Sequence, residues 1–207
     1  MLSFFKRKNK ESDTNSDKRK KLLLMGDISD ELIKPIIEEL FRLQEEDFEG
    51  SVDLYISSTG GYVGSALSLI TVMDSINDSP NYKFKVNTVA LREIYSSAFY
   101  IWVSGYTSAT TSFSEGLIHT SFGSPEGSEN QIKDYLTQTQ RENEIITDLL
   151  LRRTTLDRDT IEKMIGDSRD HYFTDSELRR LVAIPRKLPD SYGDIDIDNL
   201  VRRANLK

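Results

Sequence analysis

The sequence predicts an α/β domain built on a largely parallel β-sheet. Short strand-like segments, in which apolar residues alternate with polar ones or form a brief apolar run, are each followed by an amphipathic helical segment. A strand–helix–strand succession of this kind is typical of βαβ units, whose strands run parallel. A helical pattern from residue 131 to about residue 153 adds one unusually long helix.

Two strand–helix pairs occupy the first half of the chain. The apolar run 22–25 predicts a strand that ends at Gly26, and Ser29 or Asp30 can cap the helix that follows. Pro35 is compatible with this helix because it lies near the first turn. Alternation over 52–56 predicts the second strand. The apolar faces of the two helices comprise Leu32, Ile33, Ile36, Ile37, Leu40 and Phe41, and then Val63, Ala66, Leu67, Ile70, Met73 and Ile76.

The second half continues the alternation. We expect a strand over 84–90, an apolar helix over 98–103 that ends before Gly105, and a strand that contains 117–119. The long helix follows. Its apolar stripe comprises Ile132, Tyr135, Leu136, Ile146, Leu149 and Leu150.

The composition describes one ordinary domain and excludes several classes of protein. The chain has 207 residues, of which 37% are hydrophobic and 29% charged, and no apolar run reaches the roughly 18 residues that a membrane-spanning helix needs. The N-terminus lacks the apolar core of a signal peptide, so we expect a cytoplasmic protein that does not contact a membrane. Without Cys, disulfides and thiolate catalysis are excluded, and with two His, His119 and His171, no metal site is expected.

Charge is unevenly distributed along the chain. Residues 1–21 contain eight basic and three acidic residues, whereas the rest contains 19 basic and 31 acidic residues. A polar, Lys-rich leader cannot bury a core, so we expect a mobile basic arm over 1–21. Because the acidic remainder repels phosphate backbones, no nucleic-acid partner is expected.

Two small-residue motifs lie where predicted strands meet helices, which is where α/β proteins place reactive groups. The pair Gly60–Gly61 can expose backbone amides to an oxyanion, although a tight turn is the commoner reason for such a pair. Ser96–Ser97 precede an apolar helix, so one hydroxyl could act as an acyl-transfer nucleophile. Helix capping is the more frequent role of serine at this position.

Three further residues carry possible proton-transfer chemistry. His119 ends an apolar strand and could accept the proton of a serine, although a core histidine bonded to a backbone carbonyl is the simpler interpretation. Asp170 and His171 are adjacent, and neighbouring side chains rarely face each other. We therefore expect Asp170 to point inward and His171 to be exposed, with a surface or capping carboxylate as the alternative for Asp170.

The order of the motifs is more informative than any one of them. Residues 54–61 read Leu-Tyr-Ile-Ser-Ser-Thr-Gly-Gly, Ser96 precedes a helix that ends before Gly105, and residues 117–119 read Leu-Ile-His. The long helix and then Asp170-His171-Tyr172-Phe173-Thr174 follow. In this order, over residues 22–184, these motifs resemble the proteolytic subunit of the Clp protease (ClpP). The resemblance implies the ClpP/crotonase-like fold of repeated β-α spiral units, with a long protruding handle helix.

The resemblance also implies a function and a set of site residues. Ser96 would be the nucleophile, His119 the general base and Asp170 the orienting acid of a serine endopeptidase, with the amides of Gly61 and Ser97 as the oxyanion hole. Its substrate would be a peptide or unfolded protein, held by a segment that contains Gly123, Ser124 and Pro125. The chain would form stacked seven-membered homo-oligomeric rings fed by an ATP-dependent unfoldase. No cofactor is implied, and residues 185–207 would be a C-terminal extension.

The chain also departs from the family pattern, which leaves alternatives open. Bulky or charged residues, Arg92 to Tyr95, stand where the family has small residues before the nucleophile, and they could narrow the cleft or displace the Ser96 hydroxyl. A catalytically inactive structural or regulatory ring subunit is therefore the second hypothesis. A crotonase-type acyl-CoA enzyme, which shares the fold and an amide oxyanion hole, is the third.

Overall fold

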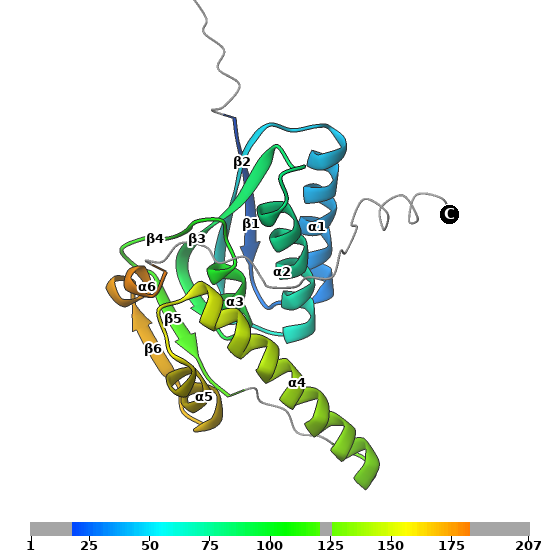
Figure 1. The fold of residues 1–207 in the computed structure, drawn as a ribbon, viewed down its shortest axis with the longest axis vertical. Helices are drawn as coiled ribbons and strands as arrows, with labels where there is room; N and C mark the ends of the chain where they lie inside the picture. The colour runs from blue at the N-terminus through cyan, green and yellow to red at the C-terminus, as the bar shows by residue number, and fades with distance from the viewer. Residues whose placement is uncertain (1–17, 121–125, 183–207) are drawn as a thin grey trace, which may run out of the picture.

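The fold is a six-stranded sheet with helices packed on it, as the computed structural model of residues 18–120 and 126–182 shows (Figure 1). The strands lie in the order β1-β2-β3-β5-β6, and β4 pairs with another part of β3. The strands are β1 (Arg19–Met25), β2 (Gly50–Ser58), β3 (Phe84–Tyr95), β4 (Ser108–Thr110), β5 (Glu115–Ile118) and β6 (His171–Thr174). The helices are α1 (Asp30–Glu45), α2 (Val63–Asp78), α3 (Ser97–Val103), α4 (Glu129–Arg153), α5 (Arg158–Gly166) and α6 (Asp175–Leu181).

All strand pairs are parallel except one. The strands β1, β2, β3, β4 and β5 form parallel ladders, and β6 joins β5 antiparallel. Because successive parallel strands need crossover connections, helices lie between β1, β2 and β3 along the chain. The predicted α/β class is therefore confirmed. The antiparallel strand β6 begins beside the end of β5, so the residues that precede β6 and those that follow β5 lie at the same edge of the sheet.

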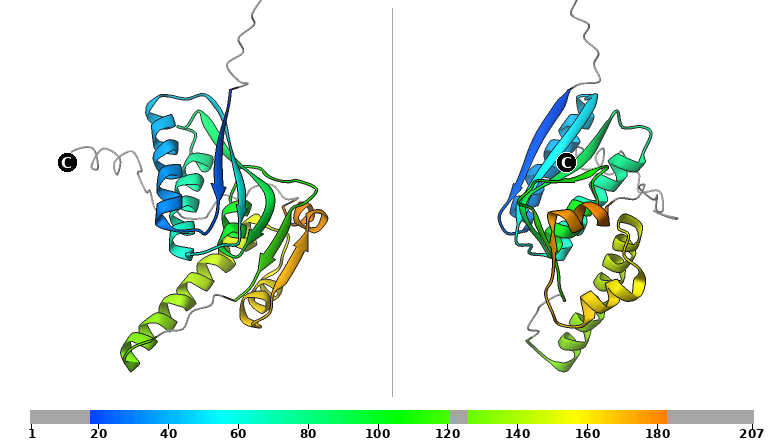
Figure 2. Two further views of the ribbon diagram at one scale, coloured as in Figure 1. Left: turned by 180° about the vertical axis from the view of Figure 1, so that it is seen from behind. Right: turned by 90° about the vertical axis from the view of Figure 1, so that its left-hand side faces the viewer.

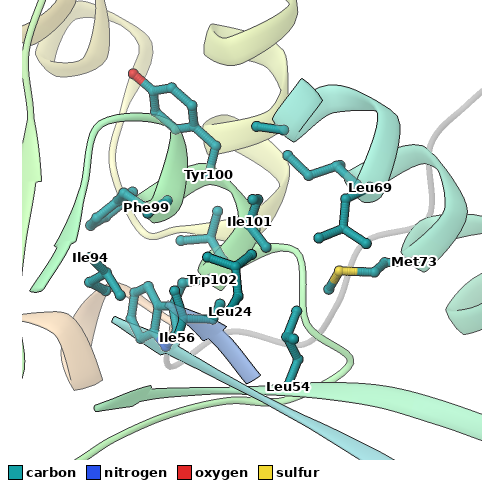
Figure 3. Packing of buried hydrophobic residues seen from close by; sticks show 14 of the residues in the cluster. Leu24, Leu54, Ile56, Leu69, Met73, Ile94, Phe99, Tyr100, Ile101 and Trp102 are labelled. Carbon is teal, nitrogen blue, oxygen red and sulfur yellow. The ribbon is translucent and has the colours of Figure 1, made fainter. Parts of the chain in front are cut away.

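The core lies between the sheet and its covering helices. One continuous hydrophobic cluster joins the inward-facing strand residues to the apolar faces of α1, α2 and α3. Figure 3 shows part of this cluster. Its largest fully buried side chains include Trp102, Phe84, Phe99, Leu54, Ile56, Leu69 and Met73. Helix α3 is buried along its whole length, so the residue that begins it is held by a rigid element.

Helix α4 projects from the body of the molecule (Figures 1 and 2). A capping box between Ser128 and Gln131 starts it two residues before the predicted start. Its C-terminal part packs into the core through Ile146, Leu149 and Leu150, whereas Leu136 is 52% exposed. The predicted long helix is confirmed as an element.

The sequence predicted some boundaries and short elements incorrectly. Strand β1 begins at Arg19 rather than at residue 22, because its first residues pair with β2, starting with Arg19 and Ser51. The Arg19 side chain also lies 3.1 Å from the buried Asp53 carboxylate. Strand β3 continues beyond residue 90 to Tyr95. The strand around 117–119 ends at Ile118, and β4, α5, β6 and α6 were not predicted. Most of the expected arm, 1–17, and the expected extension, 185–207, lie outside the described residues. Within the described ranges, no helix is both long and apolar enough to cross a bilayer.

Candidate active site

Ser96 occupies a sharp turn between β3 and the buried helix α3. Its backbone has φ 54° and ψ −125°, a conformation that residues other than glycine rarely adopt. The Ser96 amide donates to the Leu117 carbonyl at 2.9 Å, and the Ser96 carbonyl accepts from the Phe99 amide at 2.9 Å. The flanking strand and helix thus hold a strained residue at the carboxyl end of the sheet, as is common for functional residues.

The Gly60–Gly61 turn lies directly against Ser96. Both glycines have positive φ, 101° and 148°. Two backbone hydrogen bonds from Ile28 hold the turn in place. The Ile28 amide donates to the Gly60 carbonyl at 2.8 Å, and the Ile28 carbonyl accepts from the Tyr62 amide at 2.9 Å. The Ser97 hydroxyl donates to the Gly61 carbonyl at 3.2 Å. The turn is therefore positioned by bonds to both the β1–α1 connection and α3 rather than by its own conformation alone.

The amides of Gly61 and Ser97 are available donors beside Ser96. Within residues 18–120 and 126–182, the structure gives neither amide an acceptor. Ser97 is the first residue of α3, where helical amides have no intrahelical partner. Two fixed amides next to a hydroxyl are what stabilisation of a tetrahedral oxyanion requires.

The strand register brings His119 and Asp170 to the same end of the sheet. Tyr95 of β3 pairs with Leu117 of β5, so Ser96 and His119 both lie just past the carboxyl ends of neighbouring strands. Ile118 of β5 pairs with His171 of antiparallel β6. His119 follows, and Asp170 precedes, the last residue pair of this ladder. The strands β3, β5 and β6 therefore carry three residues that are distant in the sequence to the same end of the sheet.

The expected orientations of Asp170 and His171 are wrong. Asp170 is exposed and accepts a hydrogen bond from the Tyr172 hydroxyl at 3.5 Å. His171 is half-buried, and its Nε2 lies 2.9 Å from Asp167 Oδ1. The reason is the pleat of β6: His171 shares the face of buried Phe173, whereas Asp170 shares the face of Tyr172. The contact with Tyr172 was not predicted, although the i, i+2 spacing of Asp170 and Tyr172 predicts a shared face in a strand.

Tyr95 is turned away from the candidate site. Its hydroxyl donates to Glu115 Oε2 at 2.8 Å, and its ring meets that of Tyr172 edge-on at a centroid distance of 6.0 Å. Glu115 lies four residues before His119, about 13 Å along an extended strand. Burial and the Glu115 carboxylate raise the pKa of Tyr95 to about 12. The bulky residue before Ser96 therefore packs on β5 and β6 in this conformation.

Two remaining expectations concern other parts of the site. Gly123, Ser124 and Pro125, the expected substrate-binding residues, lie outside the described residues. Among the residues that are described, no group of three or more His, Asp or Glu side chains could hold a metal ion.

Comparison with known proteins gives the family. A family model of the Clp protease matches residues 7–181. The chain belongs to the Clp protease family. It is also 26% identical, over 160 residues, to the ATP-dependent Clp protease proteolytic subunit of Dehalococcoides mccartyi, an alignment that covers 76% of each chain. The resemblance drawn from the motifs is thus confirmed, and the chain is a divergent Clp-type protease subunit of a serine peptidase family.

Proposed function

We propose that this Clp protease family member is an active serine endopeptidase that hydrolyses peptide bonds with Ser96, His119 and Asp170. The supporting observation is the placement of these residues at one end of the sheet: Ser96 in its strained turn, the amides of Gly61 and Ser97 beside it, and His119 and Asp170 next to the last residue pair of β5 and β6. This is the set of roles that acyl transfer to a serine requires.

The mechanism assigns one step to each group. His119 accepts the Ser96 proton as Oγ attacks the peptide carbonyl, and the tetrahedral oxyanion receives hydrogen bonds from the Gly61 and Ser97 amides. His119 then protonates the leaving amine. Water, deprotonated by His119, hydrolyses the acyl-enzyme and restores Ser96. Each oxyanion donor of this type lowers the barrier by roughly 3 to 4 kcal/mol. Asp170 orients His119 and stabilises its protonated form, and no cofactor takes part.

The second candidate is a ring subunit without activity. Its support is the exposed Asp170 carboxylate, which meets Tyr172, together with the change from small residues to Arg92–Tyr95 before the serine. Family membership gives no support to the third hypothesis, an acyl-CoA enzyme.

Labelling with a fluorophosphonate probe separates the two candidates. We expect wild-type protein to be labelled at Ser96 and to hydrolyse a fluorogenic peptide, and Ser96→Ala to lose both. Ser97→Ala is the matched control, because it keeps the backbone amide and loses only the hydroxyl bond to the Gly61 carbonyl; its labelling should slow by less than about tenfold, the effect of one hydrogen bond. A folded wild-type protein that neither labels nor hydrolyses peptide supports the inactive subunit.

Assembly and partners are part of the same proposal. We propose that the chain forms stacked seven-membered rings, that Gly123, Ser124 and Pro125 hold the substrate as an added strand, and that an ATP-dependent unfoldase supplies unfolded protein in the cytoplasm. The name of the D. mccartyi relative supports the link to ATP. Leu136 and Ile145, half-exposed on projecting α4, are apolar side chains that a second copy could cover.

Sedimentation velocity tests the assembly. Leu136→Glu should lower the oligomeric state, because it places a charge in the proposed interface. Thr137→Glu should not, because exposed Thr137 lies on a different face of the helix from Leu136 and Ile145. A monomeric wild-type protein would contradict the ring proposal.

A further inference from the structure

Asp170 lies in a short loop that is held from both sides. The loop connects α5 to β6 over residues 167–170. Asp167 Oδ1 accepts from the Arg169 amide at 3.1 Å and lies 2.9 Å from His171 Nε2. The Ser168 amide donates to Thr120 Oγ1 at 3.2 Å. These bonds hold residues on both sides of Asp170.

The loop conformation depends on such contacts. Ser168 has φ 57°, in the left-handed region, which costs a residue other than glycine of order 1 kcal/mol or more. A strained backbone persists only when its surroundings determine it. Four contacts of the loop are made with residues outside it. The Asp167 amide donates to the Lys163 carbonyl of α5 at 2.9 Å, and the Tyr172 hydroxyl donates to Asp170. The other two come from His171 in β6 and from Thr120, which immediately follows His119.

The Asp167–His171 contact is better shielded than most ion pairs of this chain. The two side chains are 21% and 22% exposed, whereas those of the i, i+4 pair Lys34–Glu38 on α1 are 75% and 63% exposed. The hydrogen bond from His171 lowers the pKa of Asp167, which favours the carboxylate that accepts both bonds. Solvent-exposed pairs contribute little, so the shielding distinguishes this contact from a surface pair.

We infer that Thr120, Asp167 and His171 are positioning residues that hold the loop carrying Asp170 beside the end of β5, where His119 lies. The inference rests on the proposed function, since Asp170 needs a fixed place only if His119 is the base. Thr120 ties the backbone beside His119 to the loop, and the Asp167–His171 bond ties the two sides of Asp170 together. The separation of His119 and Asp170 is therefore set by these three residues in addition to the β5–β6 ladder.

Paired substitutions test the inference with the full-length protein. His171→Leu removes the donor, whereas His171→Gln keeps one at nearly the place of Nε2. Thr120→Val removes the acceptor at almost constant volume, whereas Thr120→Ser keeps it. We expect His171→Leu and Thr120→Val each to lower two rates by about 10-fold to 100-fold: kcat for a fluorogenic peptide and the rate of Ser96 labelling. KM should change less than about twofold, because misplacement of a catalytic group acts on the chemical step. His171→Gln and Thr120→Ser should retain most of the activity, and Lys34→Ala is the control for loss of an i, i+4 pair.

Each outcome decides a separate point. If the bond-removing and bond-keeping replacements lose activity equally, or if His171→Leu and Thr120→Val label Ser96 at the wild-type rate, the positioning role is wrong while the peptidase stands. If wild-type protein is not labelled, the peptidase and the positioning role fail together. Should His171→Leu not fold, the Thr120→Val and Thr120→Ser comparison decides the inference by itself.

Discussion

Gly60 packs against Ser96 so closely that no larger residue fits between them. A Cβ at Gly60 would lie 2.8 Å from Ser96 Cβ and 2.8 Å from the Tyr95 carbonyl oxygen. The positive φ of Gly60, 101°, also disfavours any side chain. The turn after β2 and the turn after β3 are therefore mutually dependent, and the position of the candidate nucleophile depends on a glycine 36 residues earlier.

Gly60→Ala should displace Ser96. We expect kcat/KM for peptide hydrolysis to fall by about 100-fold or more, since small displacements of a nucleophile have effects of this size. Gly64→Ala is the control, because in the described part of the chain a Cβ there meets no atom within 4 Å and α2 tolerates alanine. Wild-type activity in Gly60→Ala would show that the packing does not control Ser96.

Tyr95 should affect the stability at high pH more than catalysis. Its hydroxyl points to Glu115, so Tyr95→Phe should keep kcat within about threefold of wild type, the scale of one partly exposed hydrogen bond. Because the folded pKa of about 12 lies above the ordinary value of 10.0, folding retains the phenol proton that the unfolded chain loses. The stability that Tyr95 contributes is present below about pH 10 and is lost as the pH rises towards about 12.

Chemical denaturation of wild type and Tyr95→Phe at about pH 8, 10, 11 and 12 measures this contribution. The wild-type free energy of unfolding should fall more steeply over the upper half of this range than that of Tyr95→Phe. Parallel curves would show that Tyr95 does not titrate differently in the folded and unfolded states.

The ion pair between Arg153 and Asp74 should be important for attaching α4 to α2. The two side chains are each 2% exposed and lie 2.9 Å apart. Asp74→Ala leaves a buried guanidinium without this carboxylate, which we expect to lower the free energy of unfolding by about 3 to 5 kcal/mol. Thermal and urea denaturation measure the loss.

Asp148→Ala provides the comparison for that measurement. Asp148 pairs with Arg158 at 3.0 Å, but both side chains are more than half exposed, so the loss should stay below about 1 kcal/mol. If Asp74→Ala and Asp148→Ala lose the same free energy of unfolding, the buried ion pair of Asp74 is no more important for stability than the exposed pair of Asp148.

Local sequence pattern predicted the main elements because their periodicity reflects which face is buried. The second strand, the helix that directly follows it and the long helix each have enough residues for that pattern to be visible. Strands β4 and β6 have only three and four residues, so their alternation is not distinctive. The extra residues of β1 are Arg and Lys, which form strand because they pair with β2, Arg19 with Ser51 and Lys21 with Asp53. A partner strand from another part of the chain cannot be recognised from the local sequence pattern.

The fold class, the residue types at the candidate site and their order along the chain could be predicted without a structure, because they follow from local periodicity and from motifs within a few residues. The tertiary structure was needed to show that β6 runs antiparallel to β5 and so carries Asp170 to the same end of the sheet as His119, that Tyr95 turns towards Glu115, and that His171 pairs with Asp167. Those relationships depend on the register between strands that are far apart in the chain, and a shift of one residue would move each side chain to the opposite face of the sheet.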